Sequence, residues 1–321
     1  MRHAERVRLG RRGPEVTRLG FGASAIGGLF APVSEEDARA TLGRAIELGI
    51  RYVDTAPLYG LGRSERLVGE VLRAHPDAGV ALSTKVGRLL RSDGEGAETI
   101  PPGMWHGAGG VVSVLDFSRD GVRRSLEESL ERLGCRRVDV AYVHDPDDHL
   151  QQAVAEALPA LLELRDEGLV GAVGVGMTDA AALARIVVDA PPDCILLAGR
   201  FTLLDRSALA ELLPLCERRE VAVVVGGVLN SGVLARPVAG ARYDYVPAAP
   251  AVLARAQRLA EVCSAAGVPL LAAALQFPLR HPAVVSVLTG VRSVAELEAN
   301  VAAFDVHIPD ALWDELEEVR A

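Results

Sequence analysis

The stretch Val221-Ala-Val-Val-Val225 places five apolar residues in succession, with no polar residue between them. A strand with one buried face alternates apolar and polar side chains, whereas a strand buried on both faces does not alternate. Strands buried on both faces are typical of parallel sheets that are covered by helices. The stretch therefore predicts an α/β fold with a parallel sheet.

Similar short apolar runs recur along the whole chain and alternate with amphipathic runs. The expected strands are Leu19–Ala23, Arg51–Asp54, Val80–Lys85, Val138–Val143, Val170–Val175, Cys194–Leu197, Val221–Val225 and Val284–Leu288. Helix start signals between them stand at Ser34, Ser118, Asp179 and Ser293. About eight strands that alternate with helices predict a single (β/α)₈ TIM barrel, formed by residues 1–321 as one domain. A β-hairpin is expected ahead of it, where Arg6 to Leu19 alternates around a turn.

The composition of the chain excludes several classes of protein. The chain has 321 residues, of which 50% are hydrophobic and 24% charged, which is typical of a folded protein and excludes a disordered or fibrous one. Its net charge of −9 lacks the basic surplus that nucleic-acid binding needs. Four widely separated cysteines predict neither disulfides nor a zinc site, and no apolar run reaches the roughly 18 residues of a membrane span. We expect a cytoplasmic protein that binds neither nucleic acid nor membrane.

One short motif favours a different fold. Gly20-Phe-Gly-Ala-Ser-Ala25 matches the glycine fingerprint of a dinucleotide-binding βαβ unit. That fingerprint requires a helix to begin at the glycines, and here no helix signal comes before Ser34. We interpret the match as the glycine-rich end of a barrel strand.

Titratable side chains gather where three successive strands are expected to end. Asp54, Lys85 and His144 end their strands, and Tyr59 follows Asp54 in the next loop. Because these ends meet at one mouth of a barrel, the four side chains form a candidate site for proton transfer. Lys85 is also the single lysine of a chain that otherwise uses arginine.

The four residue types complement one another chemically. A tyrosine has a pKa near 10, so Tyr59 needs a nearby cation to favour its phenolate, and Lys85 supplies one. Asp54 compensates the charge of Lys85, and His144 orients a substrate oxygen. Taken singly, Asp54 could cap a loop, Tyr59 could pack and His144 could be an ordinary buried histidine. Their joint occurrence at neighbouring strand ends favours chemistry.

The sequence resembles the aldo-keto reductases. The resemblance rests on Gly49 to Gly60, Ser83-Thr-Lys-Val-Gly87, Asp139 to His144 and Asp116 to Gly134, and it covers nearly the whole chain. It implies that Asp54, Tyr59, Lys85 and His144 are the catalytic tetrad and that the hairpin caps the barrel bottom. The segments at Leu197–Asp205, Val224–Leu234 and His144–His149 are similar to the branch of D-threo-aldose (L-fucose) 1-dehydrogenases, which also holds pyridoxal 4-dehydrogenases.

The resemblance further implies a nicotinamide cofactor and no metal. By position, Leu229 and Gly232 belong to the loop around the pyrophosphate, and the adenosine lies against a second set of residues: Gly290, Ser293, Glu296 and Asn300. Many NADP-dependent members have arginine where Glu296 stands, so we expect NAD to be preferred over NADP, although Arg292 lies close by. The chain departs from the family pattern around the nicotinamide at Gly176-Met177, Ala198 and Gly226.

The substrate side of the site is less specific. Trp105 and His106, in a glycine-rich insertion, are candidates for a wall against a sugar, and a tryptophan there could equally fold its own loop. Asp145, Asp147, Asp148 and His149 resemble metal ligands, but we expect Asp147 or Asp148 to cap a helix near Leu150 instead.

The expected activity is NAD(P)-dependent oxidation of an aldose, such as L-fucose or D-arabinose, at C1. Pyridoxal oxidation and general aldehyde reduction remain alternatives within the family. A Schiff-base lyase that uses Lys85 and a nicotinamide-sensing binding subunit are alternatives from other classes. We expect a small sugar or aldehyde as the partner, and a monomer or a homodimer.

Overall fold

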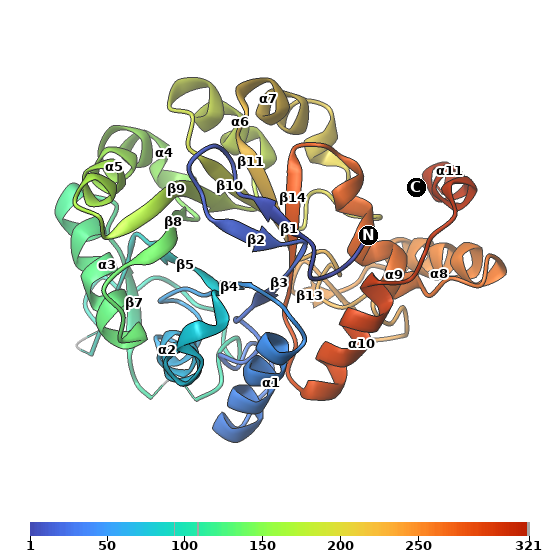
Figure 1. Cartoon of the computed structure of the whole chain (residues 1–321), viewed down its shortest axis with the longest axis horizontal. Coiled ribbons are helices and arrows are strands. Elements are labelled where there is room, and N and C mark those ends of the chain that lie inside the picture. The colour runs from blue at the N-terminus through green and yellow to red at the C-terminus, as the bar shows by residue number, and fades with distance from the viewer. Residues whose placement is uncertain (93, 108, 320–321) are drawn as a thin grey trace.

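The computed structural model describes residues 1–92, 94–107 and 109–319. Eight parallel strands close into a barrel in the order in which they follow one another along the chain (Figure 1). They are β3 (Leu19–Gly22), β4 (Tyr52–Asp54), β5 (Ala81–Val86), β8 (Val138–His144), β9 (Val170–Met177), β10 (Cys194–Ala198), β11 (Ala222–Gly226) and β14 (Val284–Thr289). All eight expected strands are confirmed, with ends that differ by one or two residues.

Helices surround the barrel on its outside (Figure 1). They are α1 (Glu35–Glu47), α2 (Arg63–Ala74), α3 (Arg119–Leu133), α4 (Leu150–Gln152), α5 (Leu158–Asp166), α6 (Ala180–Asp189), α7 (Leu212–Arg219), α8 (Pro250–Ala265), α9 (Leu270–Gln276), α10 (Val294–Phe304) and α11 (Asp310–Glu318). Four of them begin where the sequence predicts, because Ser34, Ser118, Asp179 and Ser293 each accept a hydrogen bond from a backbone N–H of the first turn.

Strand β11 shows why the apolar run from Val221 to Val225 does not alternate with polar residues. Ala222 and Val224 of β11 pack inside the barrel, whereas Val223 and Val225 pack outward against the helices. Both sets of side chains are buried. The sheet therefore separates two apolar layers, as the sequence predicts.

A hairpin closes the bottom of the barrel. Strands β1 (Arg6–Arg8) and β2 (Glu15–Thr17) pair antiparallel and lie across the barrel opening (Figure 1). Leu9 and Val16 of this hairpin are fully buried in the same cluster as the barrel interior. The capping hairpin is confirmed, and the opposite end of the barrel is left to form a site.

Insertions after two strands build that opposite end, which we call the mouth. The insertion after β5 begins and ends with the hairpin β6 (Arg88–Arg91) and β7 (Val112–Leu115). The turn-rich stretch from Asp93 to Val111 predicts a loop here after a strand, and Asp93 itself lies outside the described residues. The insertion after β11 carries the hairpin β12 (Arg242–Tyr243) and β13 (Val246–Pro247).

Unusual backbone conformations concentrate at the mouth. Of the eight described non-glycine residues with positive φ, all but Glu220 lie in its loops: Phe30, Leu61, Asp145, Asn230, Ser231, Asp244 and Tyr245. Such conformations cost free energy and gather at functional sites. The backbone thus points to the same end of the barrel as the titratable residues.

The expected cap near Leu150 is wrong. A short 3₁₀ turn, Asp147–His149, precedes α4, and neither its N-cap residue, Pro146, nor that of α4, His149, makes a side-chain capping bond. A π-helical turn, Ala153–Ala157, joins α4 to α5, so this segment begins through backbone turns rather than through an aspartate cap. Within the described part of the chain, no single helix is long and apolar enough to cross a membrane; the pair Pro250–Ala265 and Leu270–Arg280 meets the criteria jointly but is bent by 104°.

Candidate active site

Three neighbouring strands bring the predicted residues together at the mouth. Asp54 pairs in register with Ser83 on β5, Lys85 with Tyr142 on β8, and His144 with Gly176 on β9. Tyr59 lies in the loop after β4, where its N–H donates to the carbonyl of Ala56 at 3.1 Å. The structure therefore joins all four residues of the expected set into one cluster.

Lys85 and Asp54 form a buried ion pair. Lys85 Nζ lies 2.6 Å from Asp54 Oδ2 and 2.9 Å from the carbonyl oxygen of Thr55. Burial alone would lower the pKa of Lys85, but Asp54, together with Tyr59, raises it above its ordinary value. Lys85 is therefore a permanent cation at neutral pH.

A column of buried hydroxyl groups supports this pair from inside the barrel. Ser83 Oγ donates to Asp54 Oδ1 at 2.7 Å and lies 3.2 Å from the hydroxyl of Tyr52. The hydroxyls of Tyr52 and Tyr142 are 3.0 Å apart, and Cys194 Sγ lies 3.7 Å from the latter. Because each hydroxyl has a single hydrogen, donation can run from Cys194 through both tyrosines and Ser83 to the Asp54 carboxylate. The column fixes Asp54 as an acceptor.

Tyr59 lies between the cation and two aromatic rings. Lys85 Nζ is 4.5 Å from the centroid of the Tyr59 ring, and the rings of Trp105 and His144 have centroids 5.7 and 5.9 Å away. Burial raises the pKa of Tyr59 to about 12, and the opposing effect of Lys85 is smaller. The cation acts in the expected direction, but burial outweighs it. Tyr59 is therefore protonated at neutral pH and needs a base, or more positive charge, to lose its proton.

His144 is a neutral imidazole. Burial, then the charges of Arg88 and Lys85, hold its pKa well below its usual range. Among the described residues, its Nδ1 is buried without a hydrogen-bond partner. Arg88 donates to the carbonyl oxygen of His144 at 2.6 Å and pairs through two bonds with Glu98 of the insertion. A neutral ring keeps one N–H donor and one acceptor for a ligand.

The insertion after β5 brings Trp105 over Tyr59. Trp105 forms an isolated antiparallel bridge with Leu29, and His106 N–H donates to the carbonyl of Gly28 at 3.0 Å. The indole Nε1 of Trp105 is buried and unpartnered among the described residues. The structure thus places Trp105 in the cluster, whereas the backbone of His106 anchors the loop.

The residues expected around a cofactor line the other side of the mouth. Gly232 has a φ of 105°, with Asn230 and Ser231 also at positive φ. Among the described residues, its own neighbours apart, no atom lies within 4 Å of the position that a Cβ on Gly232 would take. Leu229 accepts a hydrogen bond from Gly232 N–H in the same turn. The turn is therefore open beside Gly232.

The start of α10 contains three of the expected residues. Ser293 caps the helix by accepting from Glu296 N–H at 3.2 Å, and Glu296 Oε2 accepts from Arg292 N–H at 2.8 Å. Arg292 also donates to the carbonyl of Leu29 at 3.5 Å. Asn300 is buried one turn further on, and Gly290 precedes the helix close to Ala25. A carboxylate therefore stands at a helix N-terminus that would otherwise attract an anion.

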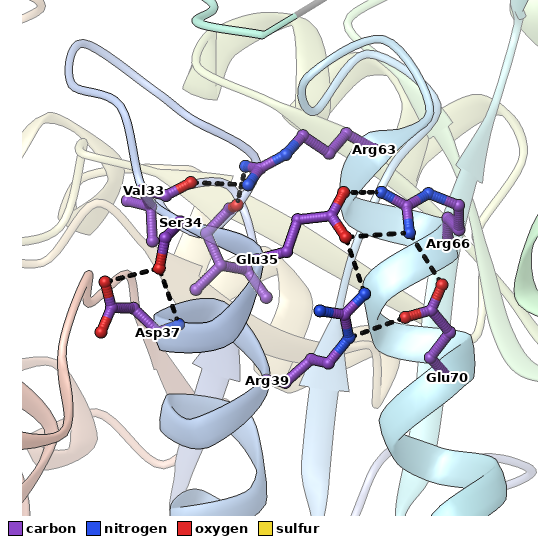
Figure 2. A network of polar contacts seen from close by, with 9 residues as sticks. Val33, Ser34, Glu35, Asp37, Arg39, Arg63, Arg66 and Glu70 are labelled. Atoms are coloured by element: carbon purple, nitrogen blue, oxygen red, sulfur yellow. Dashed lines mark hydrogen bonds and ion pairs between the residues drawn. The ribbon is translucent and has the colours of Figure 1, made fainter.

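Two cavities lie beside the cluster rather than over it. The larger, about 510 Å³, is lined by Glu35, Arg63, Arg66, Glu131 and Arg132 among others. Figure 2 shows why its arginines are not free to bind an anion: Arg66 contacts Glu35 and Glu70, and Arg63 donates to the carbonyls of Ile26 and Val33. Arg132 pairs with the buried Glu65. This network fastens the loop after β3 to α1 and α2, so we assign the site to the tetrad cluster.

The smaller cavity, about 280 Å³, adjoins the cluster through one residue. Trp105 lines it together with Leu61, Ile100, Pro101 and Ser113. Trp105 therefore borders both this cavity and the ring of Tyr59.

Comparison with known proteins identifies the arrangement. The sequence model of the aldo/keto reductase family matches residues 18–321. The chain belongs to this family. It is 43% identical to a pyridoxal 4-dehydrogenase from Microbacterium luteolum, over 98% of this chain and 97% of that protein. It is 42% identical to a D-threo-aldose 1-dehydrogenase from a Pseudomonas species, over 96% and 95% of the two chains. An L-galactose dehydrogenase from Arabidopsis thaliana is 34% identical over 92% and 86%.

Solved structures support the same fold. An aldo-keto reductase from Bacillus halodurans in its holo form superposes with a TM-score of 0.79 at 24% identity, over 99% of this chain and 96% of that one. A glycerol dehydrogenase from Gluconobacter oxydans gives 0.77 at 22%, over 98% and 95%. The chain is thus an oxidoreductase of a family that uses nicotinamide cofactors.

Small residues stand near the mouth on three successive strands of this aldo/keto reductase. Gly176 is the penultimate residue of β9, and Ala198 and Gly226 end β10 and β11. A Cβ on Gly176 would lie 3.5 Å from Leu196 and 3.9 Å from Tyr142, a Cβ on Gly226 would lie 3.4 Å from Leu196, and neither glycine has positive φ. Neither the backbone conformation nor the packing therefore requires glycine at these two positions. Met177 is fully buried in the outer core, so its side chain does not face the mouth.

Several residues that support the site were not predicted from the sequence. The column residues Tyr52, Ser83 and Tyr142 each stand two positions before a selected residue, and residues two apart on a strand share a face. The hydroxyl residues two positions before each titratable residue could therefore have been predicted to lie beside it. Arg88, by contrast, acts through a carbonyl and an insertion carboxylate, which only the fold brings together.

Proposed function

We propose that this chain oxidises an aldose such as L-fucose or D-arabinose at C1, giving the aldonolactone, with a nicotinamide cofactor. The observation that carries the proposal is the cluster of Tyr59, the Lys85–Asp54 pair and neutral His144 at the mouth. The similarity at 42% to a D-threo-aldose 1-dehydrogenase supports the substrate class.

Each side chain has a defined task in this proposal. The substrate's C1 hydroxyl lies against Tyr59 and His144, and Tyr59 Oη removes its proton as the C1–H bond breaks and the C1=O bond forms. His144, being neutral, donates one N–H to the reacting oxygen. Lys85 stabilises the phenolate, and Asp54 keeps Lys85 charged. When bound, the oxidised cofactor supplies the hydride acceptor and a positive charge that favours the phenolate.

We propose Leu229, Gly232, Gly290 and Asn300, with Ser293 and Glu296, as the cofactor-binding residues, with NAD preferred over NADP. Glu296 places a carboxylate at the N-terminus of α10, held there by Arg292 N–H. A 2′-phosphate at that position would meet like charge. The guanidinium of Arg292 makes only a 3.5 Å contact with the carbonyl of Leu29, too long to hold it away from a phosphate, so Arg292 opposes this preference.

Pyridoxal oxidation is a second candidate, favoured by 43% identity to a pyridoxal 4-dehydrogenase over nearly the whole chain. It would use the same residues on the hydroxyl of the cyclic hemiacetal that the 4-formyl group forms with the neighbouring hydroxymethyl group, so that loss of a proton and a hydride gives a lactone. Imine formation on Lys85 is disfavoured, because an imine-forming amine must be neutral and Asp54 raises the pKa of Lys85. We further propose one domain over residues 1–321 and, because the four cysteines are free, a cytoplasmic place of action as a monomer or homodimer.

The test is a substrate panel with product identification. The purified chain is mixed with NAD⁺ or NADP⁺ and with L-fucose, D-arabinose, L-galactose or pyridoxal, while formation of reduced nicotinamide is followed and the product is identified by NMR. Sugar-dependent reduction of NAD⁺ with formation of a lactone supports the proposal. Turnover of pyridoxal alone would make pyridoxal the substrate in place of an aldose. No turnover with any pair of cofactor and substrate contradicts the proposal.

A further inference from the structure

Asp145 follows His144 directly and is held beside its imidazole. Asp145 Oδ2 lies 3.5 Å from His144 Nε2, and Asp145 N–H donates to the carbonyl of Gly176 at 2.9 Å. The residue has a φ of 44°, a left-handed conformation that aspartate and asparagine tolerate better than most residues. Its side chain is 35% exposed, so a ligand at the mouth can reach the carboxylate.

The carboxylate has no donor of its own. Within the described ranges, no N–H or O–H group is within hydrogen-bonding geometry of its oxygens, and the contact to His144 Nε2 is too long to be a good bond. The two nearby cations are engaged elsewhere: Arg88 with Glu98 and the His144 carbonyl, Lys85 with Asp54 and the Thr55 carbonyl. The Asp145 carboxylate is therefore positioned by its own backbone rather than by a side-chain donor, and it is accessible to a donor on a ligand.

We propose that Asp145 is a specificity-determining residue that accepts a hydrogen bond from the hydroxyl on C2 of the substrate, the carbon next to the reacting C1. This inference rests on the proposed function, because it places C1 beside His144. A hydroxyl group is a neutral donor of the kind that this carboxylate lacks. A hydroxyl hydrogen bond to an ionised acceptor is stronger than one between neutral groups, so the contact discriminates between substrates that have and lack it.

The charges around Asp145 determine when it is an acceptor. Burial raises its pKa to about 6; Arg88 and Lys85 oppose the increase, and Asp147 and Glu98 reinforce it. Burial and the charge of Asp145 raise the pKa of Tyr245, in the β12–β13 turn, and His144 is neutral, so neither adds charge at neutral pH. Asp145 is thus ionised at pH 7 and protonated below about pH 6, where the C2 contact weakens.

The experiment compares two sugars that differ at one oxygen. D-Arabinose and 2-deoxy-D-ribose are identical except for the hydroxyl on C2. Their kcat/KM values are measured with NAD⁺ for the wild type, for Asp145→Asn and for the control Asp148→Asn, an exposed aspartate three residues further on. Asparagine keeps the left-handed backbone, and thermal unfolding of each variant verifies folding.

We expect the wild type and Asp148→Asn to prefer D-arabinose by about tenfold or more, as for a hydrogen bond to a charged group. In Asp145→Asn the preference falls several-fold, through D-arabinose alone, and the decline of the preference below about pH 6 disappears, while the pH dependence that Tyr59 gives to both sugars remains. Equal losses for both sugars, or a wild type without preference for D-arabinose, would overturn the proposal.

A second substrate pair separates this inference from the proposed function. If the wild type turns over no sugar, the proposed function fails, and reduction of D-glyceraldehyde and of 3-hydroxypropanal by NADH is compared instead. These aldehydes also differ in bearing or lacking a hydroxyl on C2. A preference for D-glyceraldehyde that Asp145→Asn reduces supports the role of Asp145; an unchanged preference, or no turnover of either aldehyde, overturns it.

Discussion

Asp54 and Lys85 face each other from neighbouring strands, with Oδ2 and Nζ 2.6 Å apart and side chains that are 3% and 1% exposed. A buried ion pair contributes less to stability than its distance implies, because both charges leave water. The removal of one partner is costly, however, since the other charge stays behind. A change in the charge of Asp54 or Lys85 should therefore change the free energy of unfolding as well as the site.

Asp54→Asn tests this coupling. We expect the free energy of unfolding at pH 7 to fall by about 3–5 kcal/mol, because Lys85 is left as an uncompensated buried cation. The raised pKa of Lys85 means that the stabilisation is present below its ordinary value of 10.5 and is lost as the pH rises through the higher folded-state value. Urea unfolding at pH 7 and above pH 10 measures both, with Arg123→Gln, which breaks an exposed pair with Glu167, as the control. Equal losses in the two variants would contradict the prediction.

Tyr52→Phe tests the hydroxyl column below the pair. The variant removes one link between Ser83 and Tyr142 without changing the ring. We expect a decrease of about 1–3 kcal/mol in the free energy of unfolding, the cost of leaving buried hydroxyls unpaired. Tyr243→Phe is the matched control, because its hydroxyl makes one 3.4 Å contact with Asp205 and is only partly buried. If both variants unfold at the same denaturant concentration as the wild type, the column does not stabilise the barrel.

The pKa of Tyr59 predicts opposite pH behaviour for the two directions of reaction. With a pKa of about 12, the phenol is the dominant form at neutral pH, so Tyr59 is ready to donate a proton during aldehyde reduction. Oxidation requires the phenolate, whose fraction rises with pH until the pKa is reached. We expect kcat/KM for sugar oxidation to increase from pH 7 to 10 while that for reduction does not. An oxidation profile that is flat over this range would exclude Tyr59 as the titrating base.

Glu296→Gln tests the preference for NAD. Removal of the carboxylate at the start of α10 should increase kcat/KM for NADP⁺ by about tenfold or less, the scale of an exposed charge near a helix N-terminus, and should leave the value for NAD⁺ nearly unchanged. Steady-state kinetics with both cofactors gives the ratio, and Glu298→Gln, on the same helix, is the control. A wild type that already prefers NADP⁺ would refute the role of Glu296.

The barrel was predictable because its signals are local. Each strand is a short apolar run, and four helices begin at a side chain whose capping bond lies within three residues. The tetrad was predictable for a related reason, since strand ends of a closed barrel must meet. The cap near Leu150 failed because backbone turns and a π-helical turn start that segment instead.

Long-range contacts set the features that the sequence did not predict. The high pKa of Tyr59 depends on its enclosure by Trp105 and His144, which lie 46 and 85 positions further along the chain. Asp145 looked like one of several aspartates after β8, and only its left-handed backbone and its distance to His144 distinguish it. Arg88 does not pair with Asp145 because it is engaged by Glu98, and these two residues come from β6 and from the insertion that follows it.

Proton transfer by Tyr59 is the step on which the proposed sugar oxidation depends most directly. The measurement is the initial rate of NAD⁺ reduction with L-fucose or D-arabinose for the wild type and for Tyr59→Phe, together with the affinity of each for NAD⁺. We predict that the variant keeps its cofactor affinity and loses about 10²-fold or more in kcat, the usual contribution of general acid–base catalysis. Sugar-dependent turnover that survives in Tyr59→Phe at the rate of the wild type would contradict the account.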